Sequence, residues 1–229
     1  MQPINPIKPI IKVCGMRDAD NIREVERLSA ELSIIHCPLS INLMGFIFWP
    51  KSSRYVSERP AYLPTKCKRV GVFVDEDIEQ VKRKAEEYSL DYIQLHGHES
   101  LDYCFQLKDY SIIKAISVSS RDDVAACSAY EGLVDYFLFD TKAQLPGGSG
   151  QQFDWSVLSA YQGDTPFLLS GGIGPDDAER LRAFFSAGGG SAAARCLGID
   201  LNSRFETAPG LKDVAAIRDF LTQLSHQPH

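Results

Sequence analysis

Eight short apolar segments recur along this chain of 229 residues, and their spacing is the feature that most constrains its fold. The segments lie at residues 10–14, 43–49, 70–74, 92–95, 112–116, 134–139, 167–169 and 196–201. Most of them lack the polar alternation of a half-exposed strand. Continuous apolar runs of this length are typical of parallel strands that are buried on both faces. The sequence therefore predicts a parallel sheet that is covered by helices.

Segments with helical character separate these predicted strands. They lie at residues 18–32, 78–88, 100–107, 120–130, 154–161, 175–187 and 213–224. Some carry start signals, such as Pro175 followed by two aspartates in the first turn. Each interval between strand starts has room for one strand, one helix and two loops. Eight such units predict an α/β fold, a single-domain (β/α)8 TIM barrel, which needs about 200 residues or more.

The predicted barrel domain occupies residues 1–229, with 1–9 as an N-terminal extension and 225–229 as a disordered tail. A doubly wound open sheet is the alternative architecture, because periodicity alone does not show that a sheet closes. Both architectures use the whole chain and leave no room for a second domain.

Three stretches depart from the regular pattern. Residues 32–42 have no clear assignment, and residues 52–65 contain two prolines, so we expect at most a short helix there. The Gly/Ala-rich run at 188–194 predicts a flexible connector. Neither 32–42 nor 188–194 suggests a function.

Charge and cysteine content exclude several classes of protein. The chain has 24 Lys and Arg against 30 Asp and Glu, and a net charge of −6 argues against nucleic acid or an anionic membrane as a partner. Its six cysteines form no C-x-x-C pair and no zinc-like grouping with histidine, so reduced thiols are the simplest interpretation. The sequence also has no apolar run of membrane-spanning length and no secretory segment at its start. We therefore expect a cytoplasmic protein.

A barrel of this kind places its site at the carboxyl ends of the strands, and informative residues stand at those positions. Gly171 and Gly172 follow the seventh predicted strand, and the segment from Asp200 through Asn202 to Ser203 ends the eighth. Exposed backbone N–H groups without side chains suit a phosphate group, and barrels often bind phosphate at these two loops. A tight turn without a ligand is the alternative interpretation of the two glycines.

A thiol and a carboxylate end two other predicted strands. Cys14 follows the first strand and Asp140 the sixth, so both are expected at one mouth of the barrel. Such a pair can divide proton transfer, one group donating and the other accepting. Buried packing is the common alternative for a strand cysteine. A carboxylate that closes an apolar strand more often has a partner or a chemical role.

Two basic residues complete the candidate site. Arg54, in a loop with Lys51 and two serines, could bind a substrate carboxylate with both prongs of its guanidinium, or could be a solvated loop charge. His96 could serve as an acid/base group, although a strand-end histidine bonded to backbone is the alternative that we favour slightly. His98 stands two residues on, but no carboxylate or cysteine has convincing metal-ligand spacing, so we predict no metal site.

An ordered series of motifs resembles one known enzyme family over nearly the whole chain. The motifs are KVCGM at 12–16, GFIF at 45–48, PKSSRYV at 50–56, VGVFV at 70–74, QLHG at 94–97, FDTK at 139–142, PGGSG at 146–150, FDW at 153–155, SGGI at 170–173, GIDLNS at 198–203 and PGLKD at 209–213. Each motif alone is weak, but the ordered set is specific. The set resembles the phosphoribosylanthranilate isomerases.

This resemblance implies a function and roles for individual residues. Such an enzyme converts N-(5-phosphoribosyl)anthranilate to 1-(2-carboxyphenylamino)-1-deoxyribulose 5-phosphate in tryptophan biosynthesis, an Amadori rearrangement that needs no metal or organic cofactor. It would make Cys14 the general base and Asp140 the general acid. Arg54 would bind the anthranilate carboxylate, and Gly171, Gly172 and residues 200–203 would surround the phosphate.

These roles set opposite requirements on the two acid/base groups. Asp140 must hold a proton at neutral pH, which requires a raised pKa, whereas Cys14 must be partly thiolate, which requires a lowered pKa. The expected partner is a small phosphosugar, without nucleic acid or membrane, and the chain is expected to be a monomer or a homodimer.

Two departures from the family pattern concern the shape of the site. The chain has Ile116, Ser117 and Val118 where the family often has an aromatic residue followed by arginine, and residues 32–42 replace a short connection. The remaining alternatives are another phosphosugar barrel, such as the histidine-pathway isomerase with its pair of aspartates, and a non-catalytic phosphate sensor. The absence of a half-barrel repeat and the presence of Cys14 and Asp140 argue against both.

Overall fold

The strands form one closed parallel barrel. A computed structural model describes residues 8–141, 154–186 and 191–226. The barrel strands are β1 (Ile10–Val13), β2 (Ile41–Ile47), β3 (Lys68–Phe73), β4 (Tyr92–Leu95), β5 (Ile112–Val118), β6 (Tyr136–Thr141), β7 (Phe167–Leu169) and β8 (Cys196–Leu201). They are arranged in chain order, and β1 pairs in parallel with β8, which closes the sheet. All eight predicted strands and the TIM-barrel fold are confirmed, and the open-sheet alternative is excluded.

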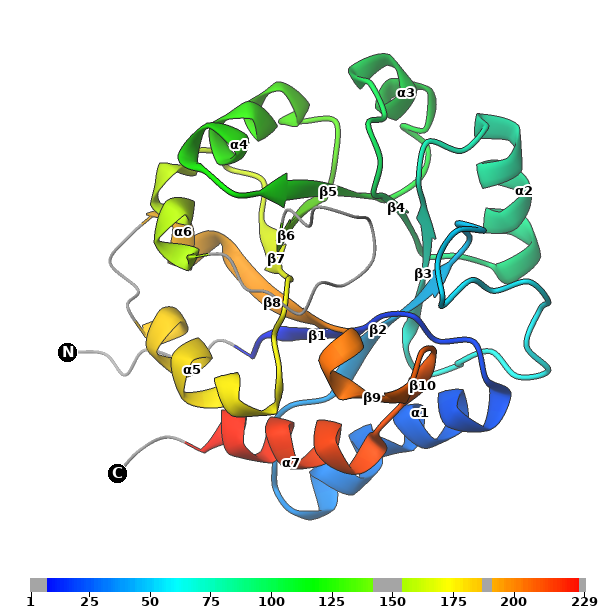
Figure 1. Cartoon of the computed structure of the whole chain (residues 1–229), viewed down its shortest axis with the longest axis vertical. Helices are drawn as coiled ribbons and strands as arrows, with labels where there is room; N and C mark the ends of the chain where they lie inside the picture. The colour runs from blue at the N-terminus through cyan, green and yellow to red at the C-terminus, as the bar shows by residue number, and fades with distance from the viewer. Residues whose placement is uncertain (1–7, 142–153, 187–190, 227–229) are drawn as a thin grey trace.

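Helices surround the barrel as an outer ring (Figure 1). The α-helices are α1 (Ala19–Ile34), α2 (Ile78–Tyr88), α3 (Leu101–Gln106), α4 (Arg121–Ala126), α5 (Ala178–Ser186), α6 (Ser191–Arg195) and α7 (Val214–Ser225). Short 3-10 helices are η1 (Cys127–Tyr130), η2 (Trp155–Ala160), η3 (Pro175–Asp177) and η4 (Ser203–Phe205). Side chains of Asp18, Asp77 and Asp213 accept hydrogen bonds from backbone N–H groups at the starts of α1, α2 and α7. These caps satisfy donors that a helix start leaves unpaired.

Residues 49–67, where at most a short helix was expected, contain turns and bends and no helix. The structure corrects three details of the other predicted elements. The helix predicted at 154–161 is the 3-10 helix η2. The predicted connector at 188–194 contains helix α6, while residues 187–190 lie outside the described residues. The propensity of three alanines for helix outweighed the flexibility of the neighbouring glycines. A small antiparallel hairpin, β9 (Glu206–Ala208) and β10 (Leu211–Lys212), was not predicted.

The structure also shows where α7 ends and how the chain turns before β2. Ser225, expected to begin a disordered tail, is the last residue of α7, and residues 1–7 and 227–229 lie outside the described residues. In the stretch 32–42, α1 continues to Ile34 and His36 turns the chain with a φ of 59°. A non-glycine residue at positive φ is typical of a tight reversal, here before β2 begins.

The apolar core consists of two clusters of buried side chains. The larger lies between the barrel wall and the helices, and the smaller fills the barrel itself. The inner cluster contains Leu43, Val70, Ile113, Ala115, Leu138 and Leu168. Toward the carboxyl ends of the strands the interior also carries buried polar groups, among them Lys12, Gln94 and Asp200. The barrel is therefore a packed core at one end and a chemically functional surface at the other.

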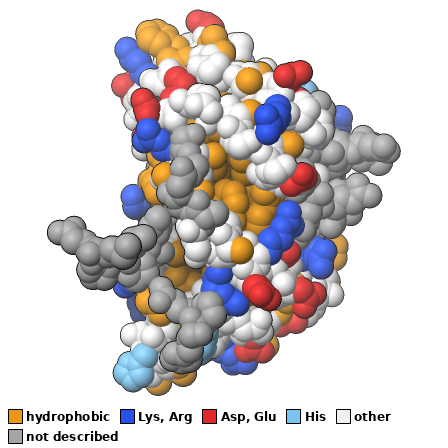
Figure 2. Space-filling view, turned by 90° about the vertical axis from the view of Figure 1, so that its left-hand side faces the viewer, with side chains coloured by type: hydrophobic (Ala, Val, Ile, Leu, Met, Phe, Trp, Pro, Cys, Tyr) orange, Lys and Arg blue, Asp and Glu red, His pale blue; other side chains and the backbone are white. Residues whose placement is uncertain are grey.

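The outer surface mixes charges of both signs. On the side of the barrel that carries α5 and α6, apolar side chains gather at the centre, with Lys, Arg, Asp and Glu side chains around them (Figure 2). Basic and acidic side chains are interspersed on this face. Among the described residues, no helix has the length and apolar character required to cross a bilayer.

Candidate active site

A cavity of about 690 Å³ opens at the carboxyl ends of the barrel strands. Its lining includes every residue predicted for the site: Cys14, Arg54, His96, Asp140, Gly171, Gly172, Asp200, Asn202 and Ser203. Ile116 and Ser117, where the chain departs from the family pattern, line the same cavity. Residues from β1, β4, β6, β8 and the intervening loops are thus brought together by closure of the sheet.

Cys14 lies just beyond β1, at the bottom of this cavity. Only 3% of the residue is exposed, and its N–H donates to the carbonyl of Leu201 at 2.9 Å. The neighbouring strand contributes Gly45, where an added Cβ would lie 2.7 Å from the Cys14 sulfur and 3.2 Å from its Cα. Only glycine leaves space for the thiol at this point. The position of the sulfur is therefore determined by close contact between β1 and β2.

A buried ion pair lies beneath the thiol. Lys12 is paired in register with Asp200 across β1 and β8, and its Nζ lies 3.0 Å from Oδ1 of that carboxylate. The Lys12 side chain is 0% exposed and the Asp200 side chain 5%. Burial disfavours the ammonium, but Asp200 and the Cys14 thiolate outweigh that effect, so the pKa of Lys12 is raised. The cation is therefore retained inside the barrel.

The pKa of Cys14 differs from the expected direction. Burial raises the pKa of this thiol above its ordinary value, and Asp200 adds to the rise. The positive charges of Lys12 and Lys212 act in the opposite direction. The sequence-based expectation of a lowered pKa was wrong, because desolvation outweighs the two lysines.

Asp140 lies on the other side of the cavity in a different environment. Its side chain is 28% exposed, and its Oδ2 lies 3.3 Å from Nε2 of His96. The second ring nitrogen, Nδ1, is 2.9 Å from the amide nitrogen of Gln94. Because an amide NH₂ can only donate, Nδ1 accepts this hydrogen bond, and a neutral ring carries its proton on Nε2, facing Asp140. His96 is thus oriented as a donor to Asp140.

Gln94 also presents an unpaired acceptor. Its Oε1 has no hydrogen-bond partner among the described residues, although the residue is buried and lines the cavity. A buried acceptor without a partner costs free energy, so such a group is suited to a ligand hydroxyl.

A second buried ion pair anchors the loop that carries His96. Nζ of Lys114 lies 2.8 Å from Oε2 of Glu99 and donates to the carbonyl of Gly97 at 2.7 Å. The Glu99 carboxylate accepts from the backbone N–H groups of Gly97 and Asp75 at 3.0 Å. These bonds hold the segment after β4 in one conformation.

Arg54 is engaged by a carboxylate at the rim. Its Nε donates to both oxygens of Glu206 at 2.9 and 3.0 Å, and its Nη2 donates to Oε2 at 2.7 Å. Lys212 contacts the same carboxylate at 2.6 Å and donates to Oδ1 of Asn202 at 2.9 Å. Burial alone would raise the pKa of Glu206, but Arg54 and Lys212 outweigh it and lower the pKa. Glu206 therefore orients the Arg54 guanidinium through the edge formed by Nε and Nη2. The third nitrogen, Nη1, does not contact this carboxylate.

The loops predicted to surround the phosphate have the expected backbone freedom. Gly171 and Gly172 have φ values of 85° and 70°, and a Cβ at Gly171 would lie 2.2 Å from the hydroxyl of Thr141. Positive φ and this close approach both require glycine. Asn202 and Ser203 lie at the start of η4. The Asp200 carboxylate would repel a phosphate. Its side chain is better suited to holding the Lys12 ammonium, with which it pairs.

Sequence reasoning missed Lys12, Gln94 and Glu206. The signal for Lys12 was present, since it is a lone charge inside an apolar strand, and such a group is almost always paired when buried. Gln94 is likewise a single polar residue in the fourth strand. Glu206 gave no comparable signal, because it lies in the hairpin that was not predicted.

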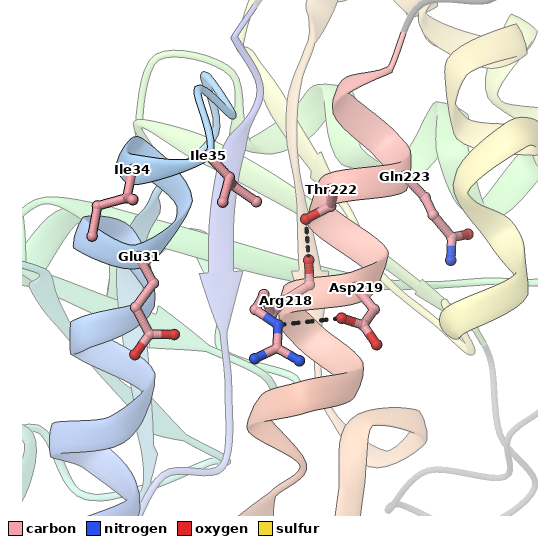
Figure 3. Close-up of a pocket in the computed structure, with 7 residues that line it drawn as sticks. All are labelled: Glu31, Ile34, Ile35, Arg218, Asp219, Thr222 and Gln223. Carbon is pink, nitrogen blue, oxygen red and sulfur yellow. Dashed lines mark hydrogen bonds and ion pairs between the residues drawn. The ribbon is translucent and has the colours of Figure 1, made fainter.

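A second recess, of about 660 Å³, lies between the end of α1 and α7, outside the barrel (Figure 3). It contains the apolar side chain of Ile34, in a residue that is 77% exposed, and a pair formed by Arg218 and Asp219 at 3.2 Å. Within the described ranges, no group of three or more His, Cys, Asp or Glu side chains could hold a metal ion at any place in the molecule.

Comparisons with known proteins agree with this geometry. The model of a family described as N-(5'phosphoribosyl)anthranilate (PRA) isomerase matches residues 12–223. The N-(5'-phosphoribosyl)anthranilate isomerase of Phocaeicola vulgatus is 47% identical over 220 residues, covering 95% of this chain and 98% of the relative.

Solved structures give the same result. Phosphoribosyl anthranilate isomerase from Thermotoga maritima superposes with a TM-score of 0.74 at 29% identity, covering 94% of this chain and 98% of that chain. A phosphoribosyl anthranilate isomerase in complex with reduced 1-(o-carboxyphenylamino)-1-deoxyribulose 5-phosphate superposes with a TM-score of 0.71 at 26% identity, with the same coverage of both chains.

Proposed function

The chain belongs to the N-(5'-phosphoribosyl)anthranilate isomerase family, and from that premise we propose that Cys14 is the general base and Asp140 the general acid of its reaction. The reaction is the Amadori rearrangement of N-(5-phosphoribosyl)anthranilate to 1-(2-carboxyphenylamino)-1-deoxyribulose 5-phosphate in tryptophan biosynthesis. The histidine-pathway isomerase and the phosphate sensor are thereby set aside as alternatives.

The chemistry requires two groups of opposite role. Asp140 donates its proton to the furanose ring oxygen, the bond from that oxygen to C1' breaks, and the nitrogen lone pair forms an iminium. The Cys14 thiolate then takes the C2' proton, and the electron pair of that C–H bond forms the C1'–C2' double bond and neutralises the iminium. The resulting enolamine tautomerises to the ketone. The steps are proton transfers and the opening of the ring at C1', with no net oxidation or reduction, so the proposal includes no metal or organic cofactor.

One observation carries the proposal: a thiol and a carboxylate from non-adjacent strands line a single cavity. The thiol is buried against two cations, whereas the carboxylate is partly open and faces a histidine. Two titratable groups with contrasting environments are the arrangement that acid/base division requires.

The remaining lining residues support a binding mode. We assign Arg54 to the anthranilate carboxylate, because Glu206 orients its guanidinium and a fork suits planar carboxylates. Backbone groups of Gly171 and Gly172, together with Asn202 and Ser203, are assigned to the phosphate. His96 is assigned to the orientation of Asp140.

The setting of the enzyme is part of the proposal. All six cysteines are free and buried, which fits a reducing compartment, and we place the enzyme in the cytoplasm. Its oligomeric state is proposed to be a monomer or a homodimer, and light scattering at two protein concentrations distinguishes them. A dimeric enzyme is known from Thermotoga maritima.

The test uses freshly prepared phosphoribosylanthranilate, whose fluorescence is lost on turnover. Cys14→Ala and Asp140→Asn are each expected to lower kcat/KM by about 10²- to 10⁴-fold, the range for removal of a general acid or base. Matched controls are Cys104→Ala, which removes a buried thiol on α3, and Asp219→Asn, which removes an exposed carboxylate on α7.

The outcomes separate the two levels of the proposal. Absence of turnover by the wild-type protein would contradict the isomerase activity itself. Turnover that Cys14→Ala retains nearly in full would leave the activity intact and remove the thiol as the base. Both control variants should keep wild-type kcat/KM.

A further inference from the structure

The charged pair beneath Cys14 stands in an unusual place for a barrel. Barrel interiors are normally filled by layers of branched apolar side chains. Here Leu43, Val70 and Leu168 do fill the inner cluster, yet Lys12 and Asp200 occupy fully buried positions in the same interior. The two residues lie opposite each other in the β1–β8 register, with 3.0 Å between Nζ and Oδ1.

Stability alone does not account for this pair. Removing two charges from water costs several kcal/mol per ion, and well-packed apolar residues in place of a buried pair are often as stable or more so. An apolar pair would also continue the existing inner cluster. The retention of a buried ammonium at this point therefore calls for a role of the charge itself.

The location of Lys12 suggests that role. It precedes Cys14 by two residues along β1, and alternate residues of a strand face the same side, so both side chains point into the barrel. The Lys12 ammonium favours the thiolate form of Cys14 electrostatically. Asp200 holds the ammonium from the neighbouring strand β8 and accepts from Ser170 at 3.5 Å.

The other charges around the cavity are already committed. Lys212 and Arg54 both bind Glu206, at 2.6 and 2.7 Å respectively. Across the cavity, Asp140 lies 3.3 Å from His96. Lys12 therefore differs from Lys212. Its carboxylate partner is Asp200, whereas Lys212 shares Glu206 with Arg54.

We propose that Lys12 is a positioning residue for the isomerisation: its ammonium, held inside the barrel by Asp200, is the counter-charge that allows Cys14 to exist as a thiolate. The inference rests on the proposed role of Cys14 as base. It predicts that the two members of the pair act on the thiol in opposite directions. Loss of Lys12 removes the cation, whereas loss of the Asp200 charge frees the ammonium to stabilise the thiolate.

The experiment measures the pH dependence of Cys14 alkylation by iodoacetamide, followed by mass spectrometry of the Cys14 peptide. The midpoint is expected to rise by about one pH unit or more in Lys12→Met and in the double variant Lys12→Met/Asp200→Asn. It is expected to fall in Asp200→Asn. The double variant removes both charges together, so it tests the proposal even if a single variant does not fold.

Two controls separate this electrostatic role from general damage to the structure. Cys196, a buried thiol whose perturbation comes from burial and backbone contacts, should keep its low reactivity in every variant. Lys212→Met should move the Cys14 midpoint less than Lys12→Met. In turnover assays, Lys12→Met should lose kcat/KM at neutral pH and recover part of it as the pH rises.

Several results would overturn the proposal. One is an unchanged Cys14 midpoint in the double variant, another a shift of the same sign in Lys12→Met and Asp200→Asn, and a third a larger shift in Lys212→Met. Alkylation does not depend on turnover, so these outcomes are distinct from failure of the proposed function, which the Cys14→Ala assay reports.

Discussion

The two sides of the cavity hold their titratable groups in different environments. On the β1 side, Cys14 is 3% exposed and rests on a buried ion pair. On the β6 side, Asp140 is 28% exposed and contacts a half-exposed histidine. The first environment is dry and depends on fixed charges, whereas the second is open to water and depends on hydrogen bonds. Substitutions should therefore disturb folding on the first side and mainly activity on the second.

The largest expected effect compares the same substitution on both sides. Asp200→Asn leaves Lys12 buried without a counter-charge and is expected to lower the free energy of unfolding by about 3 kcal/mol. Asp140→Asn should change it by less than about 1 kcal/mol while lowering kcat/KM by about 10²-fold or more. Urea unfolding and turnover assays give the two quantities.

The double variant sharpens this comparison. If Lys12→Met/Asp200→Asn regains most of the stability that Asp200→Asn loses, the loss came from the unpaired charge. Equal losses of stability in Asp200→Asn and Asp140→Asn would contradict the contrast between the two sides.

A second prediction concerns the rim. Arg54→Lys keeps the positive charge but loses the two-pronged contact with Glu206 and the fork that we assign to the substrate. A charge-assisted hydrogen bond contributes about 1.5–3 kcal/mol, so kcat/KM should fall by about 10- to 100-fold, mainly through KM. Steady-state kinetics at several substrate concentrations measures the split. Unchanged KM and kcat would remove Arg54 from the binding site.

A third prediction uses three thiols whose pKa is raised mainly by burial. Burial raises the pKa of Cys67, Cys127 and Cys196 from 9.0 to about 12. In the unfolded chain these thiols ionise near pH 9, while in the native protein they stay protonated, so the native state binds more protons between about pH 9 and 12. Stability is then complete below pH 9 and falls as the pH rises through this window.

The magnitude of this effect can be measured at one site. Each such thiol should contribute a loss of about 1.4 kcal/mol for each pH unit within the window. Urea unfolding at pH 8 and pH 10 of wild type and Cys196→Ala gives the contribution of Cys196. If the free energy of unfolding changes equally between pH 8 and pH 10 in both proteins, the Cys196 thiol contributes nothing to the pH dependence, and the prediction is contradicted.

The smallest expected effect tests the hydrogen-bonded side. Gln94→Leu removes the donor to Nδ1 of His96, a bond worth about 1 kcal/mol, and should lower kcat/KM about fivefold. Gln94→Glu replaces that donor by an acceptor and removes the hydrogen bond that orients the ring, so its kcat/KM should fall at least as far. A Gln94→Glu variant with wild-type kcat/KM would contradict the assigned orientation.

The fold was predictable because its signals are local. The apolar runs that became β1 to β8 are short and uniform, and the aspartates that cap α1 and α7 precede the helical pattern directly. The hairpin β9–β10 and helix α6 were missed, because three- and five-residue elements depend on tertiary packing more than on their own sequence.

The site was predictable in its members but not in its electrostatics. The predicted lining residues do share one cavity, since the ends of parallel barrel strands must converge. The direction of the Cys14 pKa was missed because it depends on complete burial and on Asp200, which lies on the last barrel strand and 188 residues from its partner Lys12 in the chain. No spacing rule connects such distant residues before the barrel closes.

Gly45 makes it possible to separate distance from charge in this enzyme. An added methyl group would meet the Cys14 sulfur and the β1 backbone, and nothing ionisable would be altered. Gly45→Ala would therefore force the thiol or its neighbours to shift without adding or removing a charge. Any change in rate that it produces reports how closely the thiol must approach the substrate carbon.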